Sequence, residues 1–320
     1  MTAICSTDIL IKSVIKPIQH GEGPHWDHNL QVLYYVDTFQ ATALRWDPKT
    51  NITTSFKVEE RDSIAIIVPV KGTKNEFVVG ADRFIYKVNW NGLENNTAKF
   101  QEILMVDESK PTNQFNDGKT DSAGRLWIGT LTRNTDQSVT NYGGTLYILD
   151  GKRKEERISK VSISNGLAWS ENNKKFYYID SEERNVKVYN FDLASGTICN
   201  GEVLFTLSDY PDIEGIPDGM TIDSQNNLWI AVYGGGCILK VDTKTGSLLQ
   251  RVKMPVSYVT SVAFGGANLD KLYATTSRFK LDEVGVQQQP LAGSVFELTN
   301  LGVRGKPANE FVYQEKECGK

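Results

Sequence analysis

The chain has few of the residues that usually build thiolate or imidazole sites. It contains four cysteines and three histidines in 320 residues. The cysteines lack the close pairs that mark zinc or thiol redox sites, and we read them as reduced packing or surface residues: Cys5, Cys199, Cys237 and Cys318. His20, His25 and His28 flank Glu22, where turn or surface positions explain them better than a zinc site made of imidazoles.

Long apolar runs and clusters of one charge are also missing. No apolar stretch is long enough to cross a bilayer, and the amino end lacks the basic segment and apolar run of a secretory signal. The net charge is −4, and no Lys/Arg cluster provides an electrostatic footprint for nucleic acid. We therefore expect a cytoplasmic chain with a small-molecule substrate, and neither a nucleic acid nor a membrane as its partner.

What the chain does contain is a repeated layout. In Ile216–Val232 a polar residue beside a glycine opens a short apolar strand, a turn rich in Asp and Asn follows, and a second strand carries Trp. The first large apolar residue of each second strand marks the repeat, with spacings of roughly 44 to 52 residues: Leu33, Phe77, Leu126, Phe176, Leu228 and Leu272. Blades of about fifty residues predict an all-β, six-bladed β-propeller that forms a single domain over residues 1–320.

The ends of the chain and two long insertions have expected places in this ring. Ile9–Ile18 alternates in polarity and is predicted to pair with the last blade, which hides the edge strands of a closed ring. The extreme C-terminus is expected to be flexible. Thr132–Tyr142 and Ser277–Ala292 are predicted to be loops that shape the binding pocket.

Polar residues recur at the same phase of the repeat. In five blades the residue ten or eleven positions before the marker is polar, at the start of the strand that lines the channel: Glu22, Asn116, Asn165, Asp218 and Ser261. Equal phase in the sequence predicts equal height in space, so these side chains would form a ring. Its carboxylates and carboxamides are hard oxygen donors that suit Ca²⁺, Mg²⁺ or Mn²⁺ better than structural Zn²⁺. The alternative is that each residue only caps a turn before glycine.

These segments resemble those of a known family. Gly21–Trp26, Phe115–Lys119, Ser164–Trp169, Pro217–Asp223 and Thr260–Gly266 are similar, in order, to signature segments of the regucalcin (senescence marker protein), gluconolactonase and luciferin-regenerating enzyme family. The resemblance extends from about Gly21 to Gly305. It implies a six-bladed propeller with one divalent cation in the channel, Ca²⁺ in the first place and otherwise Zn²⁺, Mn²⁺ or Mg²⁺, and lactone hydrolysis in many members.

Carried over position by position, the resemblance implies roles for individual residues. Glu22, Asn165 and Asp218 would be the metal ligands, and Asp218 would also act as the general base. Asn116 would lie beside the metal and orient the substrate. A metal ion in such a site polarises a carbonyl and lowers the pKa of a bound water.

Two substrate-binding positions depart from the family pattern. Gln114 stands where the family usually has Arg, and Asn134 aligns with an acidic residue that helps to hold sugar hydroxyls. Three readings follow: a hydrolase of lactones or related cyclic esters, a hydrolase of another electrophile such as an organophosphate or a luciferin-recycling intermediate, and a calcium-binding regulatory protein without catalysis.

Overall fold

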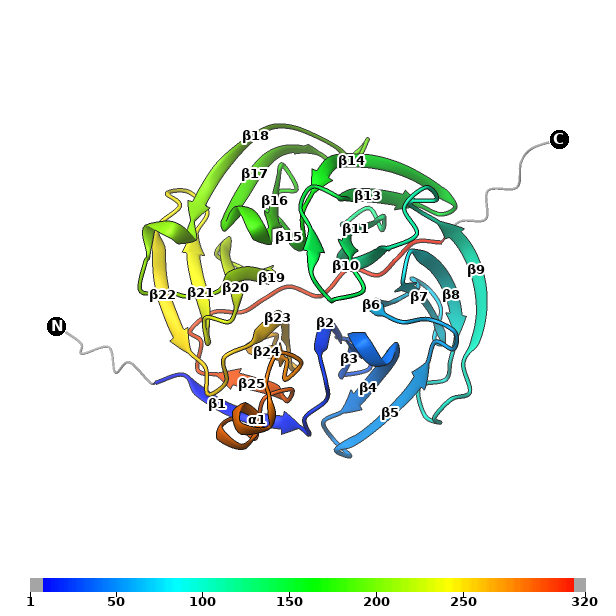
Figure 1. Cartoon of the computed structure of the whole chain (residues 1–320), viewed down its shortest axis with the longest axis horizontal. Coiled ribbons are helices and arrows are strands. Elements are labelled where there is room, and N and C mark those ends of the chain that lie inside the picture. The colour runs from blue at the N-terminus through cyan, green and yellow to red at the C-terminus, as the bar shows by residue number, and fades with distance from the viewer. Residues whose placement is uncertain (1–7, 314–320) are drawn as a thin grey trace.

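The strands form a closed ring of sheets around a channel. The structure is a computed structural model that describes residues 8–313. Within that range the strands build six antiparallel sheets, each with one strand at the channel and the others further out (Figure 1). Neighbouring inner strands contact each other in the order β2, β6, β10, β15, β19, β23 and back to β2. The predicted six-bladed propeller is confirmed.

Each blade is an up-and-down sheet whose strand order follows the chain. Blades 1 and 2 contain, from the channel outward, β2 (Gly21–Asp27), β3 (Val32–Asp37), β4 (Thr42–Asp47), β5 (Ile52–Lys57), then β6 (Ile64–Pro69), β7 (Glu76–Ala81), β8 (Phe84–Asn89), β9 (Lys99–Met105). Blades 3 and 4 contain β10 (Asn113–Thr120), β11 (Leu126–Arg133), β13 (Gly144–Asp150), β14 (Arg153–Val161), then β15 (Ser164–Trp169), β16 (Lys175–Asp180), β17 (Asn185–Asp192), β18 (Thr197–Thr206). Blade 5 contains β19 (Ile216–Ile222), β20 (Asn227–Tyr233), β21 (Cys237–Asp242), β22 (Leu248–Lys253).

The last blade is completed by the first strand of the chain. β23 (Val259–Gly265), β24 (Lys271–Thr276) and β25 (Val295–Thr299) pair in that order, and β1 (Leu10–Ile15) then pairs antiparallel with β25. The predicted pairing of the N-terminal segment with the last blade is therefore confirmed. The expectation of a flexible extreme C-terminus concerns residues outside the described range.

Both predicted loops contain regular structure that the sequence analysis missed. β11 continues to Arg133 and pairs with the two-residue β12 (Val139–Thr140), so the insertion in blade 3 is partly a hairpin. The insertion in blade 6 holds the helix α1 (Glu283–Gln288), whose N-cap Asp282 accepts a bond from the Gly285 N–H at 2.7 Å. Three 3₁₀ turns, η1 (Thr38–Gln40), η2 (Ser181–Glu183) and η3 (Leu207–Asp209), complete the elements.

Aromatic side chains fill the space between neighbouring blades. Trp26 of blade 1 stacks on Tyr273 of blade 6 with ring centroids 5.2 Å apart, and Trp127 of blade 3 lies 4.9 Å from Phe176 of blade 4. All four rings are almost fully buried. Since each burial removes a large apolar area from water, the recurrence of Trp and Tyr along the repeat is explained by packing between blades.

The Asp of the repeated turn has a structural task. Asp223 Oδ1 accepts bonds from two turn N–H groups at 2.9 Å each, and its Oδ2 accepts one from Trp229 Nε1 at 3.0 Å. Asp121 makes the equivalent bond to Trp127 Nε1 in blade 3. The turn between the first two strands is thus tied to the core tryptophan of its own blade.

A segment near the C-terminus crosses one mouth of the channel (Figure 1). Arg304 O accepts a bond from the Ser224 N–H at 2.7 Å on blade 5, and the N–H of Gly305 donates to Leu269 O of blade 6. On the other side Phe311 bridges Val70 of blade 2. We call residues 304–312 the strap, because they join opposite sides of the ring.

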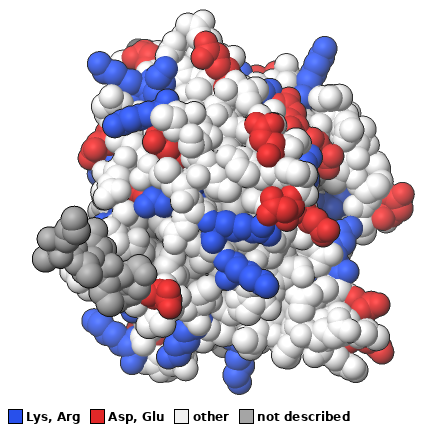
Figure 2. Space-filling model, turned by 90° about the vertical axis from the view of Figure 1, so that its left-hand side faces the viewer, with Lys and Arg blue, Asp and Glu red and all other residues white. Residues whose placement is uncertain are grey.

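Figure 2 shows the left-hand side of the molecule as it is seen in Figure 1, where acidic and basic side chains are interspersed without a large patch of one sign. Among the residues that the structure describes, no helix has the length and apolar character needed to span a membrane.

The bonds that Asp223 accepts predict that Asp223→Ala destabilises the protein strongly. The change leaves buried N–H donors without an acceptor, which typically costs about 1–3 kcal/mol for each unsatisfied group. We expect the free energy of unfolding, measured by urea denaturation, to fall by about 2–4 kcal/mol. Asp192→Ala, at an exposed turn where the carboxylate bonds to Ser195, should cost less than about 1 kcal/mol. Equal losses for the two variants would contradict this account.

Candidate functional site

The inner strands carry the five predicted ring residues to the channel. Glu22 lies in β2, Asn116 in β10, Asn165 in β15, Asp218 in β19 and Ser261 in β23. Asn116 is half-buried and the other four are buried. Because each inner strand contacts the next one around the channel, residues far apart in the sequence lie at one level of the fold.

A β-bulge interrupts each inner strand at this level. The register between the inner strand and its neighbour shifts next to Glu22, Asn165 and Ser261, and similar shifts occur in the other three blades. A bulge adds a residue on one side of a strand pair and changes the direction of its side chains. The bulges thus free the polar side chains from the usual alternation between two sheet faces.

Glycines beside the ring residues let adjacent blades approach closely. A Cβ on Gly166 would lie 2.7 Å from the backbone O of Asp218, and one on Gly219 would collide with Ser261. A Cβ on Gly23 would lie 2.8 Å from Ala65 O, and this glycine has φ of 54°. The glycine that follows Glu22, Asn165 or Asp218 is therefore needed because the inner strand of the next blade occupies the space of a side chain.

Two carboxylates at the ends of second strands hold the backbone just before the inner strand of the same blade. They are Asp37 at the end of β3 and Asp180 at the end of β16. Asp37 accepts two backbone N–H groups just before β2 at 3.0 Å each. Asp180 does the same just before β15, at 2.8 and 2.9 Å. The same device in blades 1 and 4 places Glu22 and Asn165 at the same distance along their strands.

Three buried carboxyl groups influence one another in the channel. Burial, followed by the charges of Asp218 and Asp117, raises the pKa of Glu22 well above its usual value. Burial and the charge of Asp117 likewise raise the pKa of Asp218, although the Asn165 side chain and the Gly219 N–H offset part of this effect. Such like-charge clusters favour either protonation or a bound cation.

The ammonium group of Lys119 lies close to Asp117 of this cluster. Burial raises the pKa of Asp117, and the nearby charge of Lys119 opposes that shift. Lys119 Nζ donates to Met220 O at 2.6 Å. Burial lowers the pKa of Lys119 in turn. The channel therefore holds more acidic than basic groups at the level of the ring.

The amide of Asn165 has a free acceptor. Its Nδ2 donates to Ser181 Oγ at 2.9 Å, and this hydroxyl donates to Pro217 O at 2.7 Å. These bonds fix the amide, while Oδ1 is buried and has no hydrogen-bond partner among residues 8–313. The Asn165 side chain lies close to Asp218, and the charge of Asp218 in turn acts on Glu22. Two carboxylates and an amide oxygen are a donor set that fits a hard divalent cation.

The described residues contain no group of three or more His, Cys, Asp or Glu side chains placed to hold a metal ion. The ligands implied by the family resemblance are two carboxylates, Glu22 and Asp218, and one carboxamide, Asn165. They are therefore not a group of three His, Cys, Asp or Glu side chains. His20 and His25, which stand on either side of Glu22 in the sequence, are not brought together. His20 lies near Ser277 before β2, while His25 lines a cavity at the other mouth.

The substrate-binding candidates lie on blade 3. Asn116 Nδ2 donates to Ser164 O at 2.9 Å, which fixes this amide between blades 3 and 4. Gln114 is half-buried in β10, and its Nε2 has no hydrogen-bond partner within the described range. Asn134 bonds within its own hairpin, to Ser138 Oγ at 3.0 Å and Thr140 Oγ1 at 3.2 Å.

Sequence reasoning missed Asp117 and Lys119. Neighbours on a regular strand point to opposite faces, so Asp117 would be expected to point away from the channel if Asn116 points into it. The bulge between Phe115 and Gly118 removes that constraint. Gly118, two places after Asn116, was the feature of the sequence that could have indicated this bulge.

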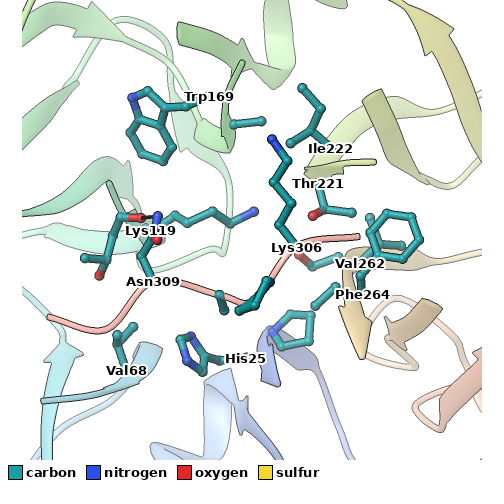
Figure 3. Close-up of a pocket in the computed structure, with 18 of the residues that line it drawn as sticks. His25, Val68, Lys119, Trp169, Thr221, Ile222, Val262, Phe264, Lys306 and Asn309 are labelled. Atoms are coloured by element: carbon teal, nitrogen blue, oxygen red, sulfur yellow. Dashed lines mark hydrogen bonds between the residues drawn. The ribbon is translucent and has the colours of Figure 1, made fainter. Parts of the chain in front are cut away.

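A cavity of about 210 Å³ lies at the mouth covered by the strap (Figure 3). Trp169, Phe264 and Val68 form part of its wall, and Lys119 and Lys306 extend over it. The charges here are largely paired, since Lys306 Nζ lies 3.6 Å from Glu171 and Lys119 is close to Asp117. We nevertheless take the polar residues of the channel, and not this cavity, as the candidate reactive centre. The carboxyl groups of Glu22 and Asp218 and the amide oxygen of Asn165 come together there.

The chain is similar to known proteins over almost its whole length. Regucalcin of Bos taurus is 37% identical over 304 residues, which cover 94% of this chain and 98% of that protein. A luciferin-regenerating enzyme structure superposes with a TM-score of 0.89 at 37% identity and covers 95% of this chain and 100% of its own. Regucalcin from Agrobacterium tumefaciens, described as a calcium-binding protein, has a TM-score of 0.84 at 21% identity, covers 96% of this chain and 98% of its own, and supports the fold alone. The family described as SMP-30/Gluconolactonase/LRE-like region matches residues 20–278, and the chain belongs to this family.

Proposed function

We infer that the protein is a hydrolase of lactones or related cyclic esters that depends on one divalent cation. The observation that carries this proposal is the meeting of two buried carboxyl groups, Glu22 and Asp218, with the orphan Oδ1 of Asn165. Membership in a family that includes gluconolactonases supports the reaction class.

Glu22, Asn165 and Asp218 would hold the cation. All three supply oxygen, which favours Ca²⁺ and also suits Mg²⁺ or Mn²⁺, whereas Zn²⁺ more often takes nitrogen or sulfur ligands. Bound there, the cation would polarise the carbonyl group of the substrate and lower the pKa of water. Asp117 would stay outside this set, with Lys119 as its counter-charge.

Asp218 and Asn116 would act on the substrate. The oxygen of a water molecule bonds to the carbonyl carbon while the Asp218 carboxylate accepts one of its protons. The bond from the carbonyl carbon to the ring oxygen then breaks, and that oxygen takes the proton from Asp218 to give the open hydroxy acid. Asn116, fixed by its bond to Ser164 O, would orient the substrate. Gln114, with a free Nε2, would contact it further out, and we place Asn134 at the edge of the same pocket.

The cation proposal predicts a stability effect of Asp218→Asn in metal-free protein. Since the folded-state pKa of Asp218 is raised, its stabilising contribution is present below the unfolded pKa of about 3.9 and is lost as pH rises through the folded pKa. With chelator at pH 7.5 the variant should therefore unfold about 2 °C or more above wild type, and the difference should shrink toward pH 4. Added Ca²⁺ should raise the unfolding temperature of wild type more than that of the variant.

Scanning calorimetry measures both effects, and Asp212→Asn provides the control. The Asp212 side chain is 76% exposed and lies outside the channel, so its replacement should leave the response to Ca²⁺ unchanged. Two results would contradict the proposed cation site at Glu22, Asn165 and Asp218. One is an unfolding temperature of Asp218→Asn below that of wild type in chelator at pH 7.5, and the other is a response of this variant to Ca²⁺ as large as that of wild type.

Hydrolysis is tested with a panel of lactones, esters and phosphotriesters in Ca²⁺, Mn²⁺, Zn²⁺ or chelator. We expect lactone turnover that chelator abolishes. Asp218→Asn should lower kcat/KM by about 10²–10⁴-fold, as is typical when a general base is lost, and Asp212→Asn should not. Asn165→Ala should increase the cation concentration needed for half-maximal activity. Turnover of phosphotriesters alone would favour the second reading, while Ca²⁺ binding without any turnover would indicate a regulatory protein.

A further inference from the structure

Five aromatic rings cluster in blades 1, 5 and 6. His20 and Tyr258 lie just before the inner strands β2 and β23, and the other three lie at or just after the ends of the second strands β3, β20 and β24: Phe39, Tyr233 and Phe279. Phe39 and Phe279 have ring centroids 4.2 Å apart, and His20 lies 4.8 Å from Phe39. Tyr233 lies 4.7 Å from Tyr258 and 6.2 Å from His20. All five residues are half-buried. We call these residues the aromatic mouth.

The aromatic mouth lies next to two of the polar residues that line the channel, Asp218 and Glu22. Tyr233 pairs with Ile216, two residues before Asp218, and the charge of Asp218 contributes to the raised pKa of Tyr233. His20 precedes Glu22 by two residues, and its Nδ1 lies 2.8 Å from Ser277 Oγ. A molecule that reaches Asp218 from this side must therefore pass these rings.

A cationic group borders the same mouth. The guanidinium carbon of Arg133 lies 5.1 Å from the centroid of Phe39. Its Nη1 donates a long bond of 3.4 Å to Gln137 O, and its Nε is buried and has no acceptor in the part of the chain that the structure describes. None of the ion pairs in residues 8–313 involves Arg133. Unused donors beside an aromatic face suit a carbonyl or anionic substituent on a flat ring.

Other polar side chains near the aromatic mouth already form hydrogen bonds within the protein, so they are less available to bind the hydroxyl groups of a polyol substrate. Asn134 is occupied by Ser138 and Thr140 within its hairpin, and His20 is occupied by Ser277. Partly exposed aromatic faces instead complement planar apolar groups, because stacking adds to the burial of apolar area.

We propose that the aromatic mouth selects substrates in which the lactone or ester is fused to or carried by an aromatic ring, with Phe39 and Phe279 as the stacking surface and Arg133 as the contact for a polar substituent. This inference rests on the proposed function, since it assigns the substrate class of the same site. It makes Phe39 and Phe279 determinants of specificity without a part in the chemical step.

The kinetic test compares dihydrocoumarin, a lactone fused to a benzene ring, with δ-valerolactone, which has the same lactone ring alone. We expect wild type to prefer dihydrocoumarin, and a Phe39→Leu/Phe279→Leu variant to lose this preference by roughly 10-fold or more, through KM rather than kcat. Turnover of δ-valerolactone should change less than about 3-fold. Phe100→Leu, at a 40% exposed ring on the outer strand β9, is the matched control.

A binding test separates this inference from the proposed function. The corresponding lactams, 3,4-dihydro-2-quinolinone and 2-piperidinone, resist hydrolysis, and their affinities are measured by calorimetry whether or not the protein is an enzyme. We expect tighter binding of the quinolinone to wild type and the loss of this difference in the Phe39→Leu/Phe279→Leu variant. Equal affinities in wild type, or a preference that survives in the folded variant, would overturn the inference. Absent lactone turnover with the binding preference intact would overturn only the proposed function.

Discussion

The close approach of neighbouring inner strands is the constraint on which the site depends. Gly166 and Gly219 each lie where a side chain would meet the next blade, and Gly23 occupies a backbone conformation that also favours glycine. Without these contacts the strands that carry Glu22 and Asp218 would stand further apart. The raised pKa values of both groups are a direct result, because burial and proximity of like charge come from the same packing.

The sequence predicted the fold well, because the repeat reflects packing that every blade shares. The Asp of the turn, the Trp of the second strand and the glycine of the inner strand each recur for a structural reason. In blade 5 the Asp and the Trp are joined directly, because Trp229 Nε1 donates to Asp223. The phase of the repeat also predicted that Glu22 and Asn165 begin inner strands at one level. Their role as cation ligands comes from the family resemblance and remains a proposal.

Features that do not follow the repeat escaped prediction for physical reasons. β12 has two residues and α1 has six, so neither is long enough to show a period. Asp117 lies beside Asn116, where regular alternation is broken by a bulge. The aromatic mouth is built from single residues at element ends, such as Phe39 and Phe279, and only the closed ring brings them together.

The two ends of the described chain fasten different parts of the ring. β1 closes blade 6 from outside, while the strap joins blades 5 and 6 to blades 2 and 3 across the channel. In a linear array of repeats the terminal unit can detach while the rest stays folded. Here β1 completes the last blade and the strap connects blades on both sides of the channel. Release of either segment would therefore remove contacts from blades that are distant in the sequence. The molecule is thus expected to lose its structure as one cooperative unit instead of blade by blade.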